Sequence, residues 1–416
     1  MSTADAFAVT EDMLLTEDAV TRLVDSVRPV PGVETVPLLE ALGRVLAEDV
    51  VAERCNPPYD NSAVDGYAVR FADLLPGTTT LLPVGLRISA GMAPDQRLAT
   101  GSAARIFTGA PLPEGADTVL PQEICRADGA AVELPPMRKA GANLRKAGED
   151  FQVGDVVLAA GRRLRPQEVG LAAAIGRPSL PVRARPRVAV FSTGDEVCDP
   201  GTAAPPGSIF DVNRFTVMAM LTLVGCVPID LGILPDRRDA VTTALARAAD
   251  GVDAVLTSGG VSTGDEDHIK AAVESLGALD FWRVAIRPGR PLAFGRIGGT
   301  PFLGLPGNPV ASMVCFMIFA RPLLLRLAGR SSWRLPMRRL PAGFDFKKRP
   351  GRREWLRGWV EADGTADAVV QRFPREGSGI LTSMVAAEGL IDLPEAMAEV
   401  APGDPIGFIP FAELWA

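Results

Sequence analysis

The sequence predicts a multidomain protein of the α/β plus β class, centred on a doubly wound α/β domain. Its 416 residues exceed what one hydrophobic core usually organises. Between 187 and 330, short apolar runs alternate with longer amphipathic segments, the pattern of a parallel sheet with helical crossovers. Residues 50–145 and 331–416 instead contain short strand-like runs broken by Pro and Gly, which predict two smaller β-rich units.

The sequence pattern in the first half of the chain predicts a lobe that is interrupted by an insertion. TEDAVTRLVDS, residues 16–26, combines a Thr cap, an acidic first turn and apolar residues at helical spacing. PQEVGLAAAIG, residues 166–176, has Pro in its first turn and Gly after its end, again typical of a helix. We therefore expect residues 1–48 and 146–182 to form one split helical lobe whose two pieces pack together, with residues 49–145 as an inserted β-module.

The second half divides at the segment PVRARPR. Residues 183–330 are expected to form the doubly wound α/β domain, with strands such as VAVFS and VDAVLTS followed by helices. The segment from 309 to 329 is the most apolar long stretch, but Arg321 and Pro322 interrupt it, so it predicts a buried helix rather than a membrane span. Residues 331–416 predict a small C-terminal β-barrel.

Composition excludes several classes of function. A formal net charge of −7 disfavours nucleic-acid binding, which requires a basic face. One His and five Cys without a CxxC pair leave no pattern for a zinc site and indicate reduced thiols in a cytosolic protein. The acidic N-terminus does not have the positive region of a signal peptide.

Polar loops follow four of the predicted strands, at 192–196, 234–239, 257–267 and 305–309. Because ligands of doubly wound sheets bind beyond the carboxyl ends of the strands, we expect these loops to share one rim. The pentapeptide STGDE occurs in two of them, at 192–196 and 262–266. The rim is therefore the predicted site.

The loop TSGGVSTGDED favours an anion such as phosphate, because its glycines allow close backbone approach and its hydroxyls precede a helix. The residues expected to contact the ligand are Ser258, Gly259, Gly260, Ser262 and Gly264. The following acids, 265–267, suggest a bridging Mg²⁺, although acids at a helix start also simply complement the helix dipole. Neither a Walker A motif nor GxGxxG is present.

Two further turns offer binding groups. Arg283, Arg287 and Arg290 flank a Pro-Gly turn and suit an oxyanion, although arginines near a turn are often only solvated. In the LPGNP turn, Pro306 and Pro309 enclose Asn308, whose amide suits a heterocycle edge or a helix cap.

Seven motifs, in this order, resemble those of the molybdopterin molybdenumtransferases, the MoeA and gephyrin E-domain family, over nearly the whole chain. They are YDNSAVDGYAVR, IFTGAPLPEGADTVL, RKAGEDF, VFSTGDEV, TSGGVSTGDEDH, RPGRPLAFG and GLPGNPV. The resemblance implies an elongated four-domain subunit in a cytoplasmic homodimer with a composite active site. It implies insertion of molybdate into adenylylated molybdopterin, with Mg²⁺-dependent release of AMP. It also implies contact with the molybdopterin adenylyltransferase and with molybdoenzymes that receive the cofactor.

The resemblance also assigns residues to roles. The rim carboxylates that hold Mg²⁺ and act in catalysis would be Glu196, Asp236 and Asp267. The inserted module would contribute Asp65, Asp150 and Thr108. Arg352 and Ser378 of the barrel would bind molybdate together with Arg287 and Arg290.

The chain departs from the family pattern where bacterial members commonly have Lys: positions 283, 287 and 290 are all Arg, which preserves charge but changes geometry. Two alternatives remain at this stage. One is the preceding adenylyl transfer to molybdopterin, against which the inserted module and the barrel argue. The other is a non-catalytic paralogue that binds molybdopterin as a scaffold, against which Glu196, Asp236 and Asp267 argue.

Overall fold

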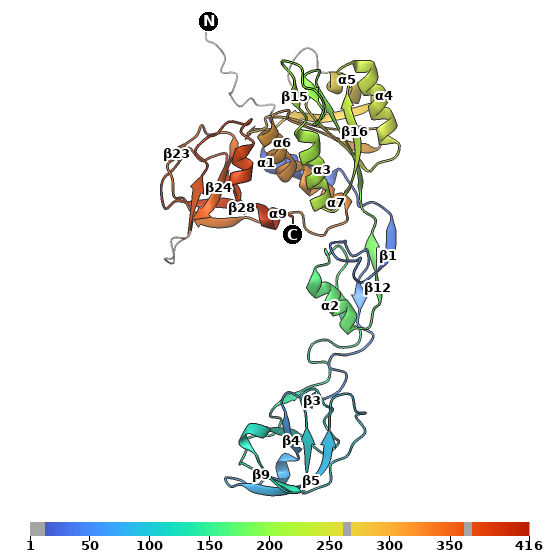
Figure 1. Ribbon diagram of the computed structural model, residues 1–416, viewed down its shortest axis with the longest axis vertical. Coiled ribbons are helices and arrows are strands. Elements are labelled where there is room, and N and C mark those ends of the chain that lie inside the picture. Colours follow the sequence, from blue (N-terminus) through green and yellow to red (C-terminus); the bar gives the residue numbers. More distant parts are fainter. Residues whose placement is uncertain (1–12, 261–267, 362–367, 416) are drawn as a thin grey trace.

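The structure, a computed structural model, describes residues 13–260, 268–361 and 368–415. The molecule is elongated (Figure 1). The α/β domain and the C-terminal β-unit lie side by side at one end, the inserted β-module lies at the other, and a small lobe connects them. The chain passes through the lobe twice, because the module is inserted within it.

A six-stranded sheet forms the centre of the α/β domain, in the order β16-β13-β17-β21-β20-β18. Its strands are β13 (Arg187–Thr193), β16 (Val227–Leu234), β17 (Ala254–Ser258), β18 (Gly277–Arg283), β20 (Pro291–Ile297) and β21 (Thr300–Leu305). The first four strands in the sheet order are parallel, as predicted. β20 is antiparallel to both of its neighbours, β21 and β18, so the prediction of a parallel sheet is wrong at this strand. Only two residues, Gly298 and Gly299, separate β20 from β21, which leaves no room for a crossover helix.

Helices cover both faces of this sheet, as expected for a doubly wound domain. They are α1 (Thr16–Asp25), α3 (Asn213–Leu223), α4 (Arg238–Ala249), α5 (His268–Leu276), α6 (Pro309–Cys315) and α7 (Arg321–Leu327). Side chains of α1, α3, α6 and α7 share one hydrophobic core with the sheet. Side chains of α4 and α5 share a second core on the other face.

The apolar segment 309–327 is one continuous helix in which η3 (Phe316–Ala320) is a π-helical stretch between α6 and α7. The irregularity ends two residues before Pro322, which cannot donate a backbone hydrogen bond. The helix is long and apolar enough to cross a membrane, yet 89% of its most apolar window is buried inside the protein. It is the core helix that the sequence predicted.

The connecting lobe is held together by strand pairing between its two chain passages. β1 (Val33–Pro37) pairs with β12 (Ser179–Arg183), and β2 (Val50–Val51) pairs with β11 (Val156–Leu158). These strands share a core with α2 (Pro166–Ala174). The two pieces of the lobe therefore pack together, but mainly through strands, and the helix α1 packs with the α/β domain instead of with α2. Helical spacing showed that α1 buries one face but could not show which partner covers it.

The inserted module contains a six-stranded sheet of order β7-β4-β6-β5-β9-β8. Its strands are β4 (Gly66–Val69), β5 (Thr80–Ile88), β6 (Ala103–Ile106), β7 (Thr118–Pro121), β8 (Arg126–Asp128) and β9 (Ala131–Leu134). The short helices η1 (Phe71–Asp73) and η2 (Gln122–Ile124) belong to the same module. β3 (Asn61–Ser62) pairs with β10 (Leu144–Arg145) where the chain enters and leaves it. Two small cores lie on the two faces of the sheet.

The C-terminal unit is a curled sheet of order β19-β24-β26-β28-β22, with β25 added beside β24. Its elements are β22 (Arg338–Pro341), β23 (Phe346–Lys347), β24 (Arg353–Glu361), β25 (Val369–Arg372), α8 (Thr382–Ala386), β26 (Gly389–Leu393), β27 (Glu399–Val400), β28 (Pro405–Pro410) and α9 (Phe411–Leu414). A bridge between Ala342 and Val370 links its two edges. The strand β19 (Ile286–Arg287) comes from the α/β domain and pairs with β24, which joins the two units directly.

Candidate functional site

A cavity of about 770 Å³ lies between the carboxyl edge of the α/β sheet and the C-terminal unit. We call it the rim cavity. Its α/β wall contains Thr193, Gly194, Glu196, Ile209, Asp236, Gly259, Gly260, Pro306, Gly307 and Asn308. Its opposite wall contains Arg287, Pro288, Gly289, Glu354, Trp355, Arg357, Glu376, Gly377 and Ser378. Residues of all four predicted rim loops therefore line one cavity, as expected for loops that follow parallel strands.

The loops after β13 and β17 approach each other closely in the α/β wall. Gly260 has φ +64°, and a Cβ there would lie 2.4 Å from Cδ1 of Ile269 and 2.7 Å from Oγ1 of Thr193. A larger residue at this position would thus require its neighbours to move. Oγ1 of Thr193 is buried and has no hydrogen-bond partner among the described residues. A bound polar ligand would satisfy this hydroxyl.

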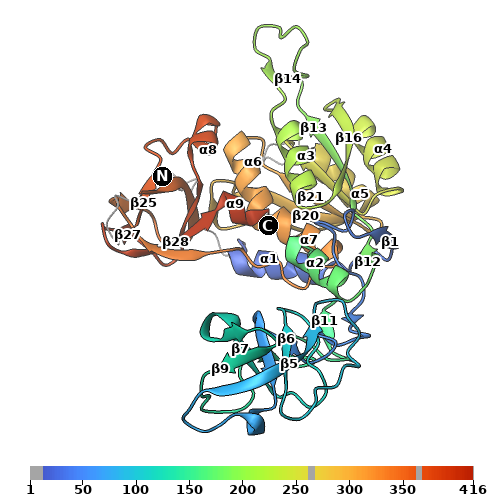
Figure 2. The same cartoon turned by 60° about the horizontal axis from the view of Figure 1, so that its bottom comes forward.

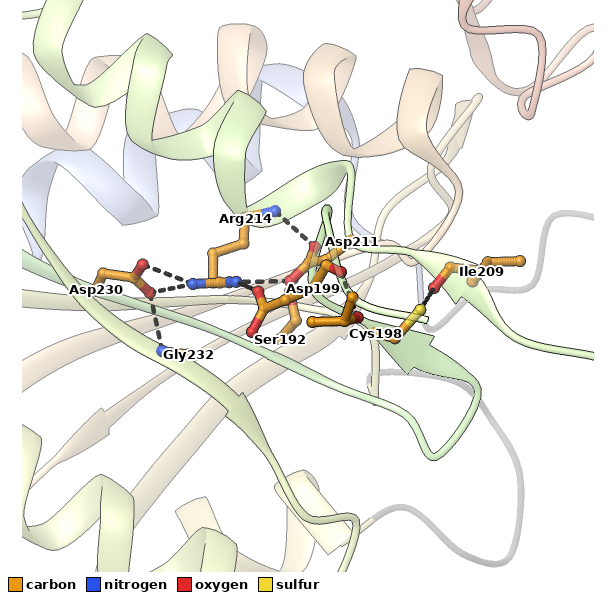
Figure 3. Close-up of polar contacts among 9 residues, drawn as sticks. Ser192, Cys198, Asp199, Ile209, Asp211, Arg214, Asp230 and Gly232 are labelled. Atoms are coloured by element: carbon orange, nitrogen blue, oxygen red, sulfur yellow. Dashed lines mark hydrogen bonds and ion pairs between the residues drawn. The ribbon is translucent and has the colours of Figure 1, made fainter. Parts of the chain in front are cut away.

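A buried arginine joins the elements that carry the rim loops (Figure 3). Arg214, on α3, is 4% exposed and forms ion pairs with Asp211, Asp199 and Asp230. Asp211 also accepts a hydrogen bond of 3.1 Å from the hydroxyl of Ser192 at the end of β13. Arg214 therefore ties the loop that begins at β14 (Val197–Cys198) to α3 and β16, behind the rim carboxylates. This loop projects from the domain (Figure 2).

Glu196 and Asp236 are two carboxylates of the rim cavity; Glu196 is exposed and Asp236 is half-buried. Their oxygens are the hard donors that Mg²⁺ prefers. Within the part of the chain that the structure describes, no group of three or more metal-ligating side chains occurs. The third predicted carboxylate, Asp267, lies outside the described residues, as do Ser262 and Gly264.

The LPGNP turn forms the floor between the two sides. The hydroxyl of Ser258 donates to the Pro306 carbonyl at 3.2 Å, and the amide of Asn213 donates to the Gly307 carbonyl at 2.7 Å. Asn308 occupies the N-cap position of α6, followed by Pro309, but its side chain makes no capping hydrogen bond within the described structure. Its exposed amide therefore remains available to a ligand in the rim cavity.

Arginines and carboxylates alternate on the opposite wall. Glu354 is 1% exposed and accepts hydrogen bonds from Arg287 at 3.2 Å and from Arg352 at 3.1 Å. Arg287 also donates to Glu376 at 3.0 Å. One buried carboxylate therefore holds two of the guanidinium groups that the sequence predicted as oxyanion ligands.

The loop that carries Ser378 is anchored on both sides. The backbone carbonyl of Ser378 accepts a hydrogen bond of 3.0 Å from the backbone N–H of Val310, in the first turn of α6. The buried Arg357 donates to the Arg375 carbonyl at 2.9 Å and to the Ser383 hydroxyl at 3.0 Å. Burial lowers the pKa of Arg357. These contacts hold Ser378 at the wall of the rim cavity.

A second cavity of about 500 Å³ adjoins this wall and includes Arg287, Arg290, Arg349 and Arg352. Burial, together with the positive charges of Arg283 and Arg352, lowers the pKa of Arg290. The three predicted arginines and Arg352 thus contribute to one positive region. Such a region attracts multiply charged anions.

The predicted residues of the inserted module lie away from the rim cavity. Asp65 accepts hydrogen bonds from the backbone N–H of Thr108 at 2.8 Å and from its hydroxyl at 2.7 Å. These bonds lower the pKa of Asp65. Asp150 accepts a hydrogen bond of 2.9 Å from Asn56. In one chain the module is at the opposite end of the molecule from the α/β domain (Figure 1).

Sequence reasoning missed Glu354, Arg357 and Glu376 as cavity residues. The signal for the first two was the run REWLRGW, in which charged residues occur inside an otherwise apolar strand. Charges buried within a strand require partners and often indicate a site. Glu376 carries no such signal, because it lies in a polar loop.

Comparisons with known proteins agree with this architecture. Residues 14–176 match the MoeA N-terminal region (domain I and II), residues 189–326 a probable molybdopterin binding domain, and residues 339–411 the MoeA C-terminal region (domain IV).

Two curated relatives match most of the chain. The molybdopterin molybdenumtransferase of Haemophilus influenzae is 36% identical over 97% of this chain and 100% of its own length. Molybdopterin molybdenumtransferase 2 of Mycobacterium tuberculosis is 37% identical over 92% of this chain and 95% of its own. A crystal structure of the molybdopterin biosynthesis MoeA protein from Pyrococcus horikoshii is similar with a TM-score of 0.84 and 29% identity, covering 96% of this chain and 100% of that one. The chain therefore belongs to the molybdopterin molybdenumtransferase family, also named MoeA.

Proposed function

We propose that this protein is a molybdopterin molybdenumtransferase. It inserts molybdate into adenylylated molybdopterin, and AMP is released in a Mg²⁺-dependent step. The observation that carries the proposal is the rim cavity, which has carboxylates and a glycine-rich loop on one wall and arginines with a hydroxyl on the other. A substrate with a pyrophosphate and a pterin requires the first wall, and a tetrahedral oxyanion requires the second.

The α/β wall binds the adenylylated substrate in this proposal. Glu196 and Asp236, together with Asp267, would hold Mg²⁺. Mg²⁺, when bound, offsets the charge of the pyrophosphate and lowers the pKa of a water molecule. Gly259 and Gly260 allow the backbone to approach the phosphates closely, and the Asn308 amide contacts the heterocycle.

The opposite wall binds molybdate. Arg287 and Arg352 offer guanidinium N–H donors that Glu354 holds in place, and Ser378 offers a hydroxyl. Arg283 and Arg290 add positive charge beside them. Guanidinium groups suit an anion with several oxygen atoms, because they present donors in a fixed plane.

The proposal includes a homodimer with a composite site. Asp65, Thr108 and Asp150 match functional positions of the family, yet the module is far from the rim cavity of its own chain (Figure 1). A second copy related by a twofold axis and running antiparallel to the first would bring its module over this cavity. The adenylyltransferase that supplies the substrate and the molybdoenzymes that receive the cofactor complete the proposed cytoplasmic pathway.

The test is incubation of the protein with adenylylated molybdopterin, Mg²⁺ and molybdate, with AMP and active cofactor measured. Production of both supports the transferase. Binding of the pterin without AMP release contradicts it and favours a scaffold, whereas formation of adenylylated molybdopterin from ATP favours the adenylyltransferase.

The variant Glu196→Ala tests the catalytic role of Glu196 separately from any effect on folding. Because Glu196 is exposed and lines the rim cavity, we expect this variant to keep the wild-type unfolding midpoint and dimer mass while cofactor formation falls by at least about a hundredfold. Asp195→Ala is the matched control, since Asp195 is also exposed but is not among the cavity-lining residues. Wild-type turnover in Glu196→Ala would remove Glu196 from the mechanism.

A further inference from the structure

Two carboxylates accept hydrogen bonds from Arg287, and they differ in how easily each can move away from it. Glu354 is 1% exposed, and both of its oxygens are engaged, one by Arg287 and one by Arg352. Glu376 is 35% exposed and lies in the loop two residues before Ser378. Moving Glu354 would leave a buried charge without its partners, whereas moving Glu376 returns a carboxylate to water.

Glu376 also has a second cation nearby. Its Oε1 lies 3.9 Å from the Nη1 of Arg372, while its Oε2 accepts from the Nη2 of Arg287. Arg372 lies over the ring of Phe346, 5.5 Å from its centre, and so has a fixed position of its own. The Glu376 carboxylate therefore lies between two guanidinium groups on one side of the rim cavity.

We propose that Glu376 is an internal competitor of the oxyanion: it occupies one edge of Arg287 when the site is empty and moves to Arg372 when a tetrahedral dianion binds. The inference rests on the proposed function, which makes Arg287 and Ser378 oxyanion ligands. A guanidinium has two edges for bidentate contacts, and here Nη1 serves Glu354 and Nη2 serves Glu376. An oxyanion that makes a bidentate contact with Arg287 competes with these carboxylates for the Nη groups, and the exposed carboxylate is the one that can leave.

This arrangement affects selectivity as well as affinity. A carboxylate beside the site repels every anion, so a ligand must bring enough charge to replace it at Arg287. Dianions such as molybdate meet this condition better than monoanions. Glu376 is thus a specificity-determining residue of the oxyanion wall.

The experiment is a calorimetric titration of molybdate into the full-length protein and into Glu376→Gln, Arg372→Gln and the double variant. Glu376→Gln is expected to bind molybdate about two- to fivefold more tightly, because a partly exposed ion pair no longer competes. Arg372→Gln is expected to bind about twofold more weakly, because the displaced carboxylate loses its second partner. The double variant is expected to match Glu376→Gln, since Arg372 acts only through Glu376. Glu399→Gln, which removes an exposed charge elsewhere in the C-terminal unit, is expected to leave the affinity unchanged.

The outcomes separate this inference from the proposed function. If the wild-type protein binds molybdate and Glu376→Gln binds it equally or more weakly, Glu376 does not compete and the inference is overturned alone. If Arg372→Gln weakens binding in the Glu376→Gln background as well, Arg372 contacts the anion itself and the exchange is wrong. If the wild-type protein binds no molybdate, both the inference and the proposed oxyanion wall fail.

Discussion

Two arginine clusters, one next to the α/β wall of the rim cavity and one within its opposite wall, both pair arginine with carboxylates but differ in burial. Arg214 is 4% exposed and contacts three aspartates behind the rim carboxylates. Arg287 is 43% exposed and contacts two glutamates in the opposite wall. The first cluster links α3, β16 and the loop at β14, whereas the second links the α/β domain to the C-terminal unit.

The difference teaches that burial, rather than the number of ion pairs, decides what each cluster does. A buried charge that loses its partners cannot be solvated, so the Arg214 cluster fixes the positions of the loops. A partly exposed pair exchanges partners at little cost, so the Arg287 cluster can accept a ligand. Preorganised carboxylates and an exchangeable oxyanion wall both suit the proposed function, in which one wall binds the adenylylated substrate and the other binds molybdate.

Arg214→Ala should produce the largest effect. Removing the guanidinium leaves Asp211, which is 2% exposed, without its cation, and we expect the free energy of unfolding to fall by about 3–5 kcal/mol. Urea unfolding of the variant and of Arg214→Lys measures this. Lys retains the charge but not the planar fork, so an intermediate loss is expected. A loss below about 1 kcal/mol in Arg214→Ala would show that the cluster does not fix the loops.

Glu168 provides an intermediate case, because one buried carboxylate lies between two exposed arginines. It is 3% exposed and contacts Arg165 at 2.6 Å and Arg162 at 2.8 Å, in the lobe. The hydrogen bond from Arg165 lowers the pKa of Glu168 from 4.5 to about 2. Its stabilisation is therefore complete above the unfolded-state pKa near 4.5 and is lost as pH falls towards 2.

We expect Glu168→Gln to lower the free energy of unfolding by about 2–3 kcal/mol at pH 7 and by about 1 kcal/mol at pH 3, where part of the stabilisation is already lost. Denaturant unfolding at both pH values checks the prediction. Glu40→Gln, at an exposed position in the same lobe, is the control. An equal loss at both pH values would mean that packing, and not the charge of Glu168, stabilises the lobe.

The rim could be predicted from the sequence because parallel strands place their carboxyl ends together. Thr193, Gly260 and Asn308 are far apart in the chain, yet each follows a predicted strand, and all three line the rim cavity. The antiparallel direction of β20 could not be predicted in the same way, because an apolar strand run does not specify its direction.

On the opposite side, Arg287 was predicted from its Pro-Gly turn, whereas Arg352 and Ser378 were predicted only from the family resemblance. Glu354 and Glu376 acquire their role from contacts with Arg287, which comes from a different unit of the chain. The sequence around these two glutamates does not identify Arg287 as their partner. The partner of α1 was missed for the same reason, since an amphipathic pattern indicates a buried face without identifying the surface that covers it.

Arg287→Gln should produce the smallest effect on stability and thereby test the comparison most directly. Glu354 keeps its hydrogen bond from Arg352, and Glu376 can be solvated, so we expect the free energy of unfolding to fall by less than about 1 kcal/mol. Molybdate affinity in the same variant should fall at least about tenfold, because a charge-assisted ligand is lost. Paired measurements of urea unfolding and molybdate titration distinguish the two quantities. A loss of stability as large as that of Arg214→Ala, with unchanged molybdate affinity, would contradict the comparison. Arg287 would then join the two units without binding an anion, and both clusters would have a structural role.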